Sequence, residues 1–149
     1  MSKLQTSQKL IFIADDDEDD RLLFLDAVHD LMLPAAVESA SDGQDLLTKL
    51  YQSLHHLPDL IFLDINMPIK NGFECLEEIR GKNSALRKVK IIMLSTSQSP
   101  DNIERCYKLG ADYYAVKPSS FQGLKDLLQK VFEMDWNSIQ KSSNQFLLA

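Results

Sequence analysis

The sequence predicts an α/β fold in which a doubly wound parallel sheet of five strands is covered by five helices. Two observations predict it: short apolar runs alternate with longer segments of helical periodicity, and turn or cap residues stand between them. Parallel strands need crossover connections, usually helices, and these bury both faces of the sheet. With 149 residues the chain is long enough to form one domain with a sizeable core.

Each predicted strand is an apolar run of roughly four to six residues, which is short for a helix. The runs are rich in β-branched and aromatic side chains, and these favour strands. They cover residues 10–14, a weaker run near Val37, and residues 60–63, 91–94 and 113–116. The run 60–63 is apolar throughout, which is typical of a central strand, yet Asp64 follows it directly.

Between these runs, apolar residues recur three or four positions apart, which predicts helices with one buried face. The expected buried stripes are Leu22, Leu25, Val28 and Met32; Leu46, Leu47, Leu50 and Leu54; Leu76 and Ile79; Ile103, Cys106, Tyr107 and Gly110; and Phe121, Leu124, Leu128 and Val131. Ser99 before Pro100 predicts the start of a helix, and Gly110 predicts the end of the same helix.

Composition and charge exclude several classes of protein. The formal charge of −6 disfavours a nucleic-acid-binding module, which needs a basic face. No apolar stretch approaches the ~18 residues of a membrane span, and the N-terminus lacks the apolar core of a signal peptide. Cys75 and Cys106 fall within expected helices, where unpaired thiols are the expected state. We therefore expect a cytoplasmic protein that binds neither nucleic acid nor membrane.

Polar residues of complementary kinds, namely carboxylates, a hydroxyl and an ammonium, follow four of the five strands. Asp15 and Asp16 follow the first, Asp64 the third, Ser95 the fourth and Lys117 the fifth. The carboxyl ends of parallel strands meet at one edge of a sheet, where ligands bind in open α/β folds. We interpret the rest of the acidic run, Asp17, Glu18, Asp19 and Asp20, as a solvated loop and the first turn of a helix, where the helix dipole favours negative charge.

The chemistry of these groups suits reversible phosphorylation of an aspartate. Close carboxylates repel one another unless a cation intervenes, and Mg²⁺ takes oxygen ligands. A carboxylate that is not needed as a ligand can accept a phosphoryl group. The metal ion and Lys117 would neutralise charge in the transition state, and Ser95 could donate a hydrogen bond to a phosphate oxygen.

Four motifs, in the same order and spacing, resemble the receiver domain of bacterial response regulators, in particular the chemotaxis-type single-domain receivers of two-component systems. They are IFIADDDEDDRLLF, PDLIFLDINMPIKNG, IIMLSTS and GADYYAVKP. The resemblance implies a flavodoxin-like three-layer sandwich with strand order 2-1-3-4-5. We expect an N-terminal tail at 1–7, the receiver domain at 8–134, and a C-terminal tail at 135–149 that packs on the domain, forms a dimer or is disordered.

The resemblance also assigns roles in phosphorylation and metal binding. It implies that Asp64 is the phosphoryl acceptor and one of the ligands of Mg²⁺. Asp16 would bind the ion directly and Asp15 mainly through water. Asn66 would contribute its backbone carbonyl, and its side chain would flank the water that hydrolyses the phosphoryl group.

Further residues are implied in switching. Ser95 would turn toward the phosphate, Lys117 would pair with it, and Tyr114 would move inward on activation. Ser97 would flank the hydrolytic water and so tune dephosphorylation. The peptide bond before Pro118 is expected to be cis.

Two residues depart from the usual pattern of receiver domains. Thr96 stands where alanine or glycine is usual, and its β-branched side chain would slow phosphotransfer or the access of small molecules. Ser119 stands where an aromatic residue is frequent, which would alter the surface near the last helix.

We therefore expect a stand-alone receiver that is not an enzyme beyond assisting its own phosphorylation and dephosphorylation. Its donor would be a sensor histidine kinase or a phosphotransfer protein. Its output would reach a downstream protein through the fourth helix, the strand 113–116 and the last helix, and the protein could also form a homodimer on phosphorylation. Two other functions stay open. A phosphatase with an aspartyl-phosphate intermediate would usually carry an acid where Asn66 stands, and an unphosphorylated interaction module would not need the acidic residues and Lys117.

Overall fold

The computed structural model describes residues 8–134, 136 and 143–148, and its strands and helices alternate as the sequence predicts. The strands are β1 (Lys9–Ala14), β2 (Ala35–Ala40), β3 (Leu60–Leu63), β4 (Lys90–Ser95), β5 (Tyr113–Val116) and β6 (Leu147–Leu148). The helices are α1 (Glu18–Asp30), α2 (Gly43–Tyr51), α3 (Gly72–Ile79), α4 (Pro100–Leu109), α5 (Phe121–Glu133) and α6 (Ser143–Phe146).

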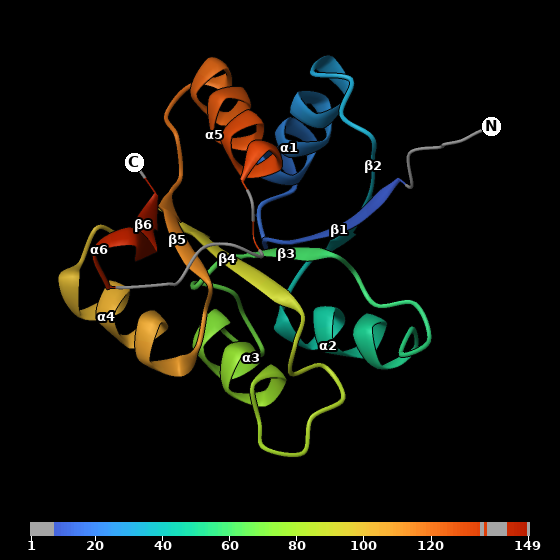
Figure 1. Cartoon of the computed structure of the whole chain (residues 1–149), viewed down its shortest axis with the longest axis vertical. Coiled ribbons are helices and arrows are strands. Elements are labelled where there is room, and N and C mark those ends of the chain that lie inside the picture. Colours follow the sequence, from blue (N-terminus) through green and yellow to red (C-terminus); the bar gives the residue numbers. More distant parts are fainter. Residues whose placement is uncertain (1–7, 135, 137–142, 149) are drawn as a thin grey trace.

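All six strands are parallel and lie in the order β2-β1-β3-β4-β5-β6. Helices α1 and α5 cover one face of the sheet, and α2, α3 and α4 cover the other (Figure 1). The predicted α/β class and the order of the first five strands are therefore confirmed. The difference is β6, which comes from the expected C-terminal tail and extends the sheet beyond β5.

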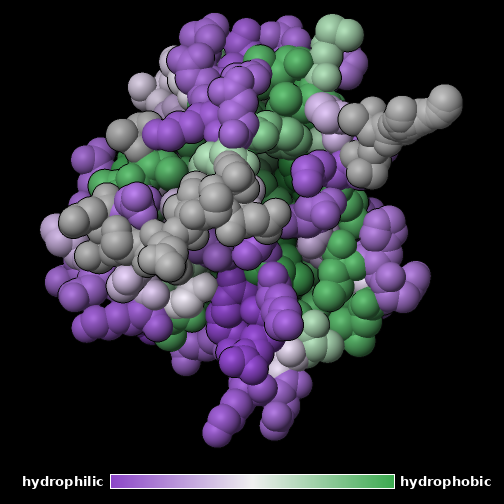
Figure 2. All heavy atoms as spheres, viewed as in Figure 1, coloured by the Kyte–Doolittle hydropathy of each residue, from purple (hydrophilic) through white to green (hydrophobic). Residues whose placement is uncertain are grey.

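The core has two layers, one on each side of the sheet, and β3 contributes to both. Leu60 and Phe62 belong to the layer under α1 and α5, whereas Ile61 and Leu63 belong to the layer under α2, α3 and α4. This alternation follows from the two-residue period of a strand. All four side chains are buried, as the uninterrupted apolar run predicts. In the space-filling view, hydrophilic side chains cover α5 and the connection from α3 to β4 (Figure 2).

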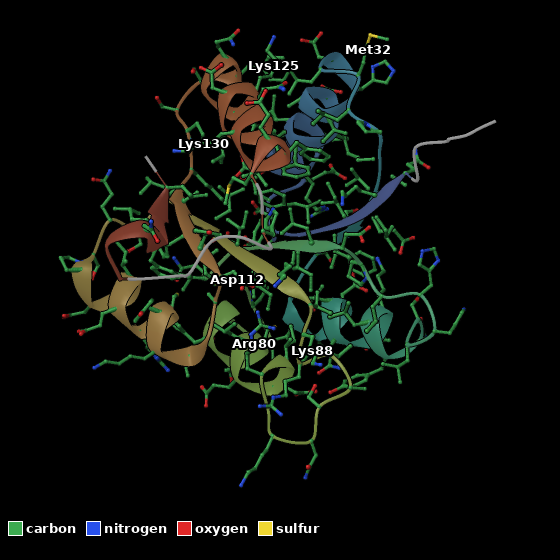
Figure 3. All side chains as sticks on the ribbon, viewed as in Figure 1. Met32, Arg80, Lys88, Asp112, Lys125 and Lys130 are labelled. Carbon is green, nitrogen blue, oxygen red and sulfur yellow. The ribbon has the colours of Figure 1, made fainter. Side chains whose placement is uncertain are left out.

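The stripe predicted for α1 is wrong except for Val28, which is buried. Leu22 is 51% exposed and Leu25 is also exposed, while Met32 lies beyond the helix and points away from the protein (Figure 3). Phe24 takes the buried place because its ring packs edge-to-face on Phe62, with 5.0 Å between ring centroids.

Cap residues occupy the helix ends where the sequence places them. The Ser99 side chain accepts a hydrogen bond from the backbone N–H of Asn102, and Pro100 is the first residue of α4. Gly110 ends this helix with a φ of 100°, a left-handed conformation that costs glycine little. Asn71 and Glu74 form a capping box at the start of α3.

Two further expectations from composition can be compared with the structure. Cys75 and Cys106 are free and buried, and burial raises the pKa of each thiol to about 12, so both remain protonated at neutral pH. Among the helices of the described residues, none combines the length and apolar character that crossing a bilayer requires.

The side chain of Arg80, at the end of α3, connects α3 to the loop before β4 and to the turn between α4 and β5. Its guanidinium donates to the backbone carbonyls of Arg87, Val89 and Gly110 and pairs with Asp112 at 2.9 Å (Figure 3). The Asp112 carboxylate also accepts the backbone N–H at the start of β4. Loss of the guanidinium would therefore leave the part-buried carbonyls of Val89 and Gly110 and the Asp112 carboxylate without this donor.

We expect Arg80→Met to lower the free energy of unfolding by about 2–4 kcal/mol, because it removes charged hydrogen bonds and leaves Asp112 unpaired. Chemical denaturation of both proteins measures this loss. Arg87→Met is the matched control and should change stability by less than about 0.5 kcal/mol, since its exposed guanidinium makes only a 3.5 Å contact with the carbonyl of Lys82. Equal losses in the two variants would contradict the role assigned to Arg80.

Candidate functional site

The predicted carboxylates converge at the carboxyl edge of the sheet because the strands that precede them are neighbours. Strands β1 and β3 pair in a register that sets Ala14 opposite Leu63, so Asp15 and Asp64 leave the sheet side by side. One carboxylate oxygen from each of Asp15, Asp16 and Asp64 lies within 4.8 Å of the other two. Asp15 and Asp64 are only 2% and 6% exposed, whereas Asp16 is open to solvent.

Backbone contacts hold Asp15 and Asp64 in place. Asp15 accepts the backbone N–H of Asp17 at 3.0 Å, and its own carbonyl accepts the Arg21 guanidinium at 2.6 Å. Behind Asp64, a Cβ on Gly72 would collide with the carbonyl oxygen of Asp64. The start of α3 can therefore press against this backbone only because residue 72 is glycine.

The ammonium group of Lys117 lies among the carboxylates. Its Nζ is 2.8 Å from Asp15, 3.2 Å from Asp64 and 3.1 Å from Asp20. The backbone N–H of Lys117 donates to the carbonyl of Ser95 at 2.8 Å, which extends the pairing of β5 with β4 and aims the lysine at the site. The convergence of Lys117 with Asp15 and Asp64 agrees with the sequence prediction.

Asp20 is the residue of this cluster that sequence analysis misses. The acidic run does form the first turn of α1, where Asp17 is the N-cap and accepts the N–H groups of Asp19 and Asp20. The Asp20 side chain, however, turns back to Lys117. Its position one helical turn after the aspartates that follow β1 is the sequence signal that could have identified it.

Burial and charge set the protonation of the site. Burial raises the pKa of Asp64 above its ordinary value, the Lys117 charge opposes this rise, and the Asp15 charge adds to it. Burial alone would lower the pKa of Lys117, but its hydrogen bond to Asp15 and the charges of Asp64 and Asp15 outweigh that effect and raise it. Lys117 is therefore cationic at neutral pH.

The donor set fits a hard divalent cation. Asp15, Asp16 and Asp64 offer carboxylate oxygens as ligands, and their combined negative charge exceeds the one positive charge of Lys117. Asp16 is open to solvent, so an ion held there could keep several waters, as Mg²⁺ prefers. Asn66 is exposed in the loop that follows Asp64, two residues along the chain.

On the β4 side of the site, three polar residues are linked. The fully buried Ser95 accepts the backbone N–H of Ser97 on its Oγ at 3.1 Å. The hydroxyl of Tyr114 donates to the carbonyl of Ser97 at 2.7 Å, and its ring is fully buried. The structure therefore has Tyr114 turned inward, with its hydroxyl bound next to Ser95. Thr96 stands between the two serines and is exposed.

The expected cis peptide bond before Pro118 is a wrong prediction, because the Lys117–Pro118 bond is trans. The trans form is intrinsically favoured by about 0.5–1 kcal/mol before proline. In this form Lys117 already reaches Asp15 and Asp64, so the position of the ammonium does not require the cis form.

A cavity of about 230 Å³ opens beside the site, between α1 and α5. Asp15 and Lys117 line its polar side, and Leu23, Pro118 and Phe121 line its apolar side. Ser119, one of the two departures noted in the sequence, also lines it. Leu23 and Phe121 are exposed, so the apolar wall continues onto the surface.

Comparisons with known proteins agree with this geometry. The family model described as "Response regulator receiver domain" matches residues 11–129. The chain is 30% identical over 135 residues to the probable methanogenesis regulatory protein FilR2 of Methanothrix harundinacea (strain 6Ac), which covers 86% of this chain and 85% of that protein.

Two solved structures are similar in fold as well as in sequence. The crystal structure of the phosphorylated cyanobacterial phytochrome response regulator RcpA is 30% identical, with a TM-score of 0.77, and the match covers 90% of this chain and 97% of that chain. The Mn²⁺-bound form of response regulator Rcp1 is 25% identical, with a TM-score of 0.74, and the match covers 90% and 99%.

We expect Lys117→Met to lower the free energy of unfolding by about 1–3 kcal/mol at neutral pH, because it leaves buried carboxylates without their cation. The difference from the unsubstituted protein should narrow as the pH falls and Asp64, whose pKa burial raises, loses the charge that Lys117 neutralises. Thermal and denaturant unfolding at neutral and lower pH measures both effects.

Lys108→Met is the control for this substitution, since Lys108 forms an exposed pair with Glu104 at 3.6 Å and should contribute less than about 1 kcal/mol. A loss in Lys117→Met that is the same at every pH would show that packing, and not charge, is what the substitution removes.

Proposed function

The chain belongs to the response regulator receiver domain family, and we infer from this that it is a phosphoryl acceptor in signal transduction with Asp64 as the modified residue. One observation carries the proposal: Asp64 is nearly buried beside a lysine and within reach of two further carboxylates. The similarity to RcpA, a response regulator whose phosphorylated form has been crystallised, supports it.

In the proposed reaction an oxygen of Asp64 attacks the phosphorus of the donor. A phosphorus–oxygen bond forms, and the bond to the leaving group breaks; with phosphohistidine this is a phosphorus–nitrogen bond, and the imidazole leaves with the electron pair. Lys117, 3.2 Å from Asp64, balances the charge that develops on the transferred group. Hydrolysis of the resulting aspartyl phosphate returns the carboxylate and inorganic phosphate.

We propose Mg²⁺ as the ion at this site, held by Asp15, Asp16, Asp64 and the backbone carbonyl of Asn66. When bound, it would neutralise the carboxylates and the incoming phosphoryl oxygens. The Mn²⁺-bound form of the similar regulator Rcp1 supports a divalent ion. The side chains of Asn66 and Ser97 are neutral, and we propose that they tune dephosphorylation by their size and hydrogen bonding.

The signal would leave the site through Ser95 and Tyr114. A phosphoryl group adds about −1.5 to −2 charge, and the Ser95 hydroxyl is the nearby group that can turn to donate to it. Because the Ser95 Oγ accepts the N–H of Ser97, whose carbonyl accepts the Tyr114 hydroxyl, a shift at Ser95 changes the setting of Tyr114. The face built from α4, β5 and α5 would then bind a downstream protein.

The donor in this proposal is a sensor histidine kinase or a phosphotransfer protein. The apolar wall formed by Leu23 and Phe121 next to Asp15 and Lys117 provides a contact surface beside the reacting groups. A donor that covers this wall would bring its phosphorylated imidazole to the edge of the sheet where Asp64 stands.

Incubation with acetyl phosphate and Mg²⁺ tests the acceptor directly. We expect the protein to gain the mass of one phosphoryl group, and we expect Asp64→Asn or removal of Mg²⁺ by a chelator to abolish this gain. Asp26→Asn, on the exposed face of α1, is the matched control and should be modified like the unsubstituted protein. Modification of Asp64→Asn to the normal extent would exclude Asp64 as the acceptor.

The departure at Thr96 leads to a second expectation. Its exposed, β-branched side chain stands beside Ser95, so Thr96→Ala should open the approach to Asp64. We expect the rate of modification by acetyl phosphate to rise by about three- to tenfold, which corresponds to about 1 kcal/mol in the barrier. Thr48→Ala on α2 serves as the control, and an unchanged rate in Thr96→Ala would show that residue 96 does not limit access.

A further inference from the structure

The C-terminal segment, residues 143–148, is seated on the face that the proposed function uses for output. Strand β6 pairs in parallel with β5, with Leu147 opposite Tyr114 and Leu148 opposite Ala115. Helix α6 lies next to α4 (Figure 1). Because β6 pairs with Tyr114 and Ala115, it covers the middle of the edge that β5 would otherwise expose.

Phe146 anchors this segment. Its side chain is 2% exposed and belongs to the same core layer as α3 and α4. Its ring packs edge-to-face on Tyr107 of α4, with centroids 5.2 Å apart, and it contacts the ring of Tyr114 at 6.3 Å in a tilted arrangement. Buried aromatic contacts of this kind stabilise a packed segment beyond the area that they bury.

Tyr114 is thus held at both ends. Its ring is packed on Phe146, and its hydroxyl donates to the carbonyl of Ser97, in the segment that follows the buried hydroxyl of Ser95. Because Phe146 packs on the Tyr114 ring, an outward movement of the tyrosine would break this contact. A set of contacts therefore joins Phe146 through Tyr114 and Ser97 to Ser95, at the end of the strand that neighbours β3 and Asp64.

We propose that Phe146 is a positioning residue for phosphorylation: docked against Tyr107 and Tyr114, it keeps Tyr114 inward and the Ser95–Ser97 segment set to receive the phosphate. This rests on the proposed function of Asp64. Since coupling between two events is reciprocal, docking of residues 143–148 strengthens phosphoryl binding, and phosphorylation strengthens docking.

The test uses the full chain with beryllofluoride and Mg²⁺ as the phosphoryl probe. Phe146→Ala should bind beryllofluoride at least about fivefold more weakly than the unsubstituted protein, the lower end of typical couplings between sites. Phe146→Leu, which refills much of the space, should recover part of the affinity. Leu147→Ala is the matched control at the next residue along the chain, because that side chain is 46% exposed, and it should bind normally.

A second readout follows Tyr114 itself, independently of any phosphoryl probe. In fluorotyrosine-labelled protein, with the resonance assigned by Tyr114→Phe, the Tyr114 signal should shift toward an exposed position in Phe146→Ala and stay in place in Leu147→Ala. In the unsubstituted protein, beryllofluoride should slow amide exchange in residues 145–148. If Phe146 only added stability, the Tyr114 resonance would keep its position in folded Phe146→Ala, and beryllofluoride would not slow amide exchange in residues 145–148.

The outcomes separate this inference from the proposed function. Equal beryllofluoride affinities in all variants with an unmoved Tyr114 signal would overturn the positioning role of Phe146 and leave Asp64 as the acceptor. Failure of the unsubstituted protein to bind beryllofluoride would overturn the proposed function and, with it, the coupling. If Phe146→Ala proves too unstable to fold, the double variant Phe146→Leu, Tyr107→Leu takes its place. Normal beryllofluoride affinity and an unmoved Tyr114 signal in that variant would overturn the inference.

Discussion

The ammonium group of Lys117 holds together a group of carboxylates that would otherwise repel one another. Asp15 and Asp64 are almost fully buried, and water can do little to screen their charges. Lys117 meets both, together with Asp20, within 3.2 Å. The one positive charge of Lys117 does not balance the negative charges of these three carboxylates. That imbalance explains why the cluster suits a divalent ion and why an incoming phosphoryl group would need one.

The sheet holds these charged residues close together although they are far apart in the sequence. Strands β1 and β3 set the aspartates side by side, and the continued pairing of β5 with β4 aims Lys117 across the edge. Both faces of the sheet are packed by helices, so these strand ends have little freedom to separate under repulsion. Movement is easier on the β4 side, where the residues between Ser95 and Ser99 form a loop outside any strand or helix.

Much of the fold and site could be predicted because strands and caps are encoded locally. The order of the first five strands and the convergence of Asp15, Asp16, Asp64 and Lys117 follow from alternation, strand ends and family motifs. The predictions that failed depend on contacts between residues that are distant in the sequence. The buried face of α1 depends on the fit of Phe24 to β3, and Asp20 is recruited by a lysine distant in sequence. Strand β6 has two residues, too few for any periodic signal.

The direction of β6 has a practical consequence for anyone who labels this protein. Because β6 runs parallel to β5, the chain passes Leu148 heading toward the same edge of the sheet as Asp64, whereas β1 begins at the opposite edge with Lys9. A fluorophore or affinity tag joined after Leu148 would lie at the same edge of the sheet as the clustered carboxylates and disturb the segment that carries Phe146. One placed before Lys9 would stand the length of the sheet away from them, and immobilisation should start from that end.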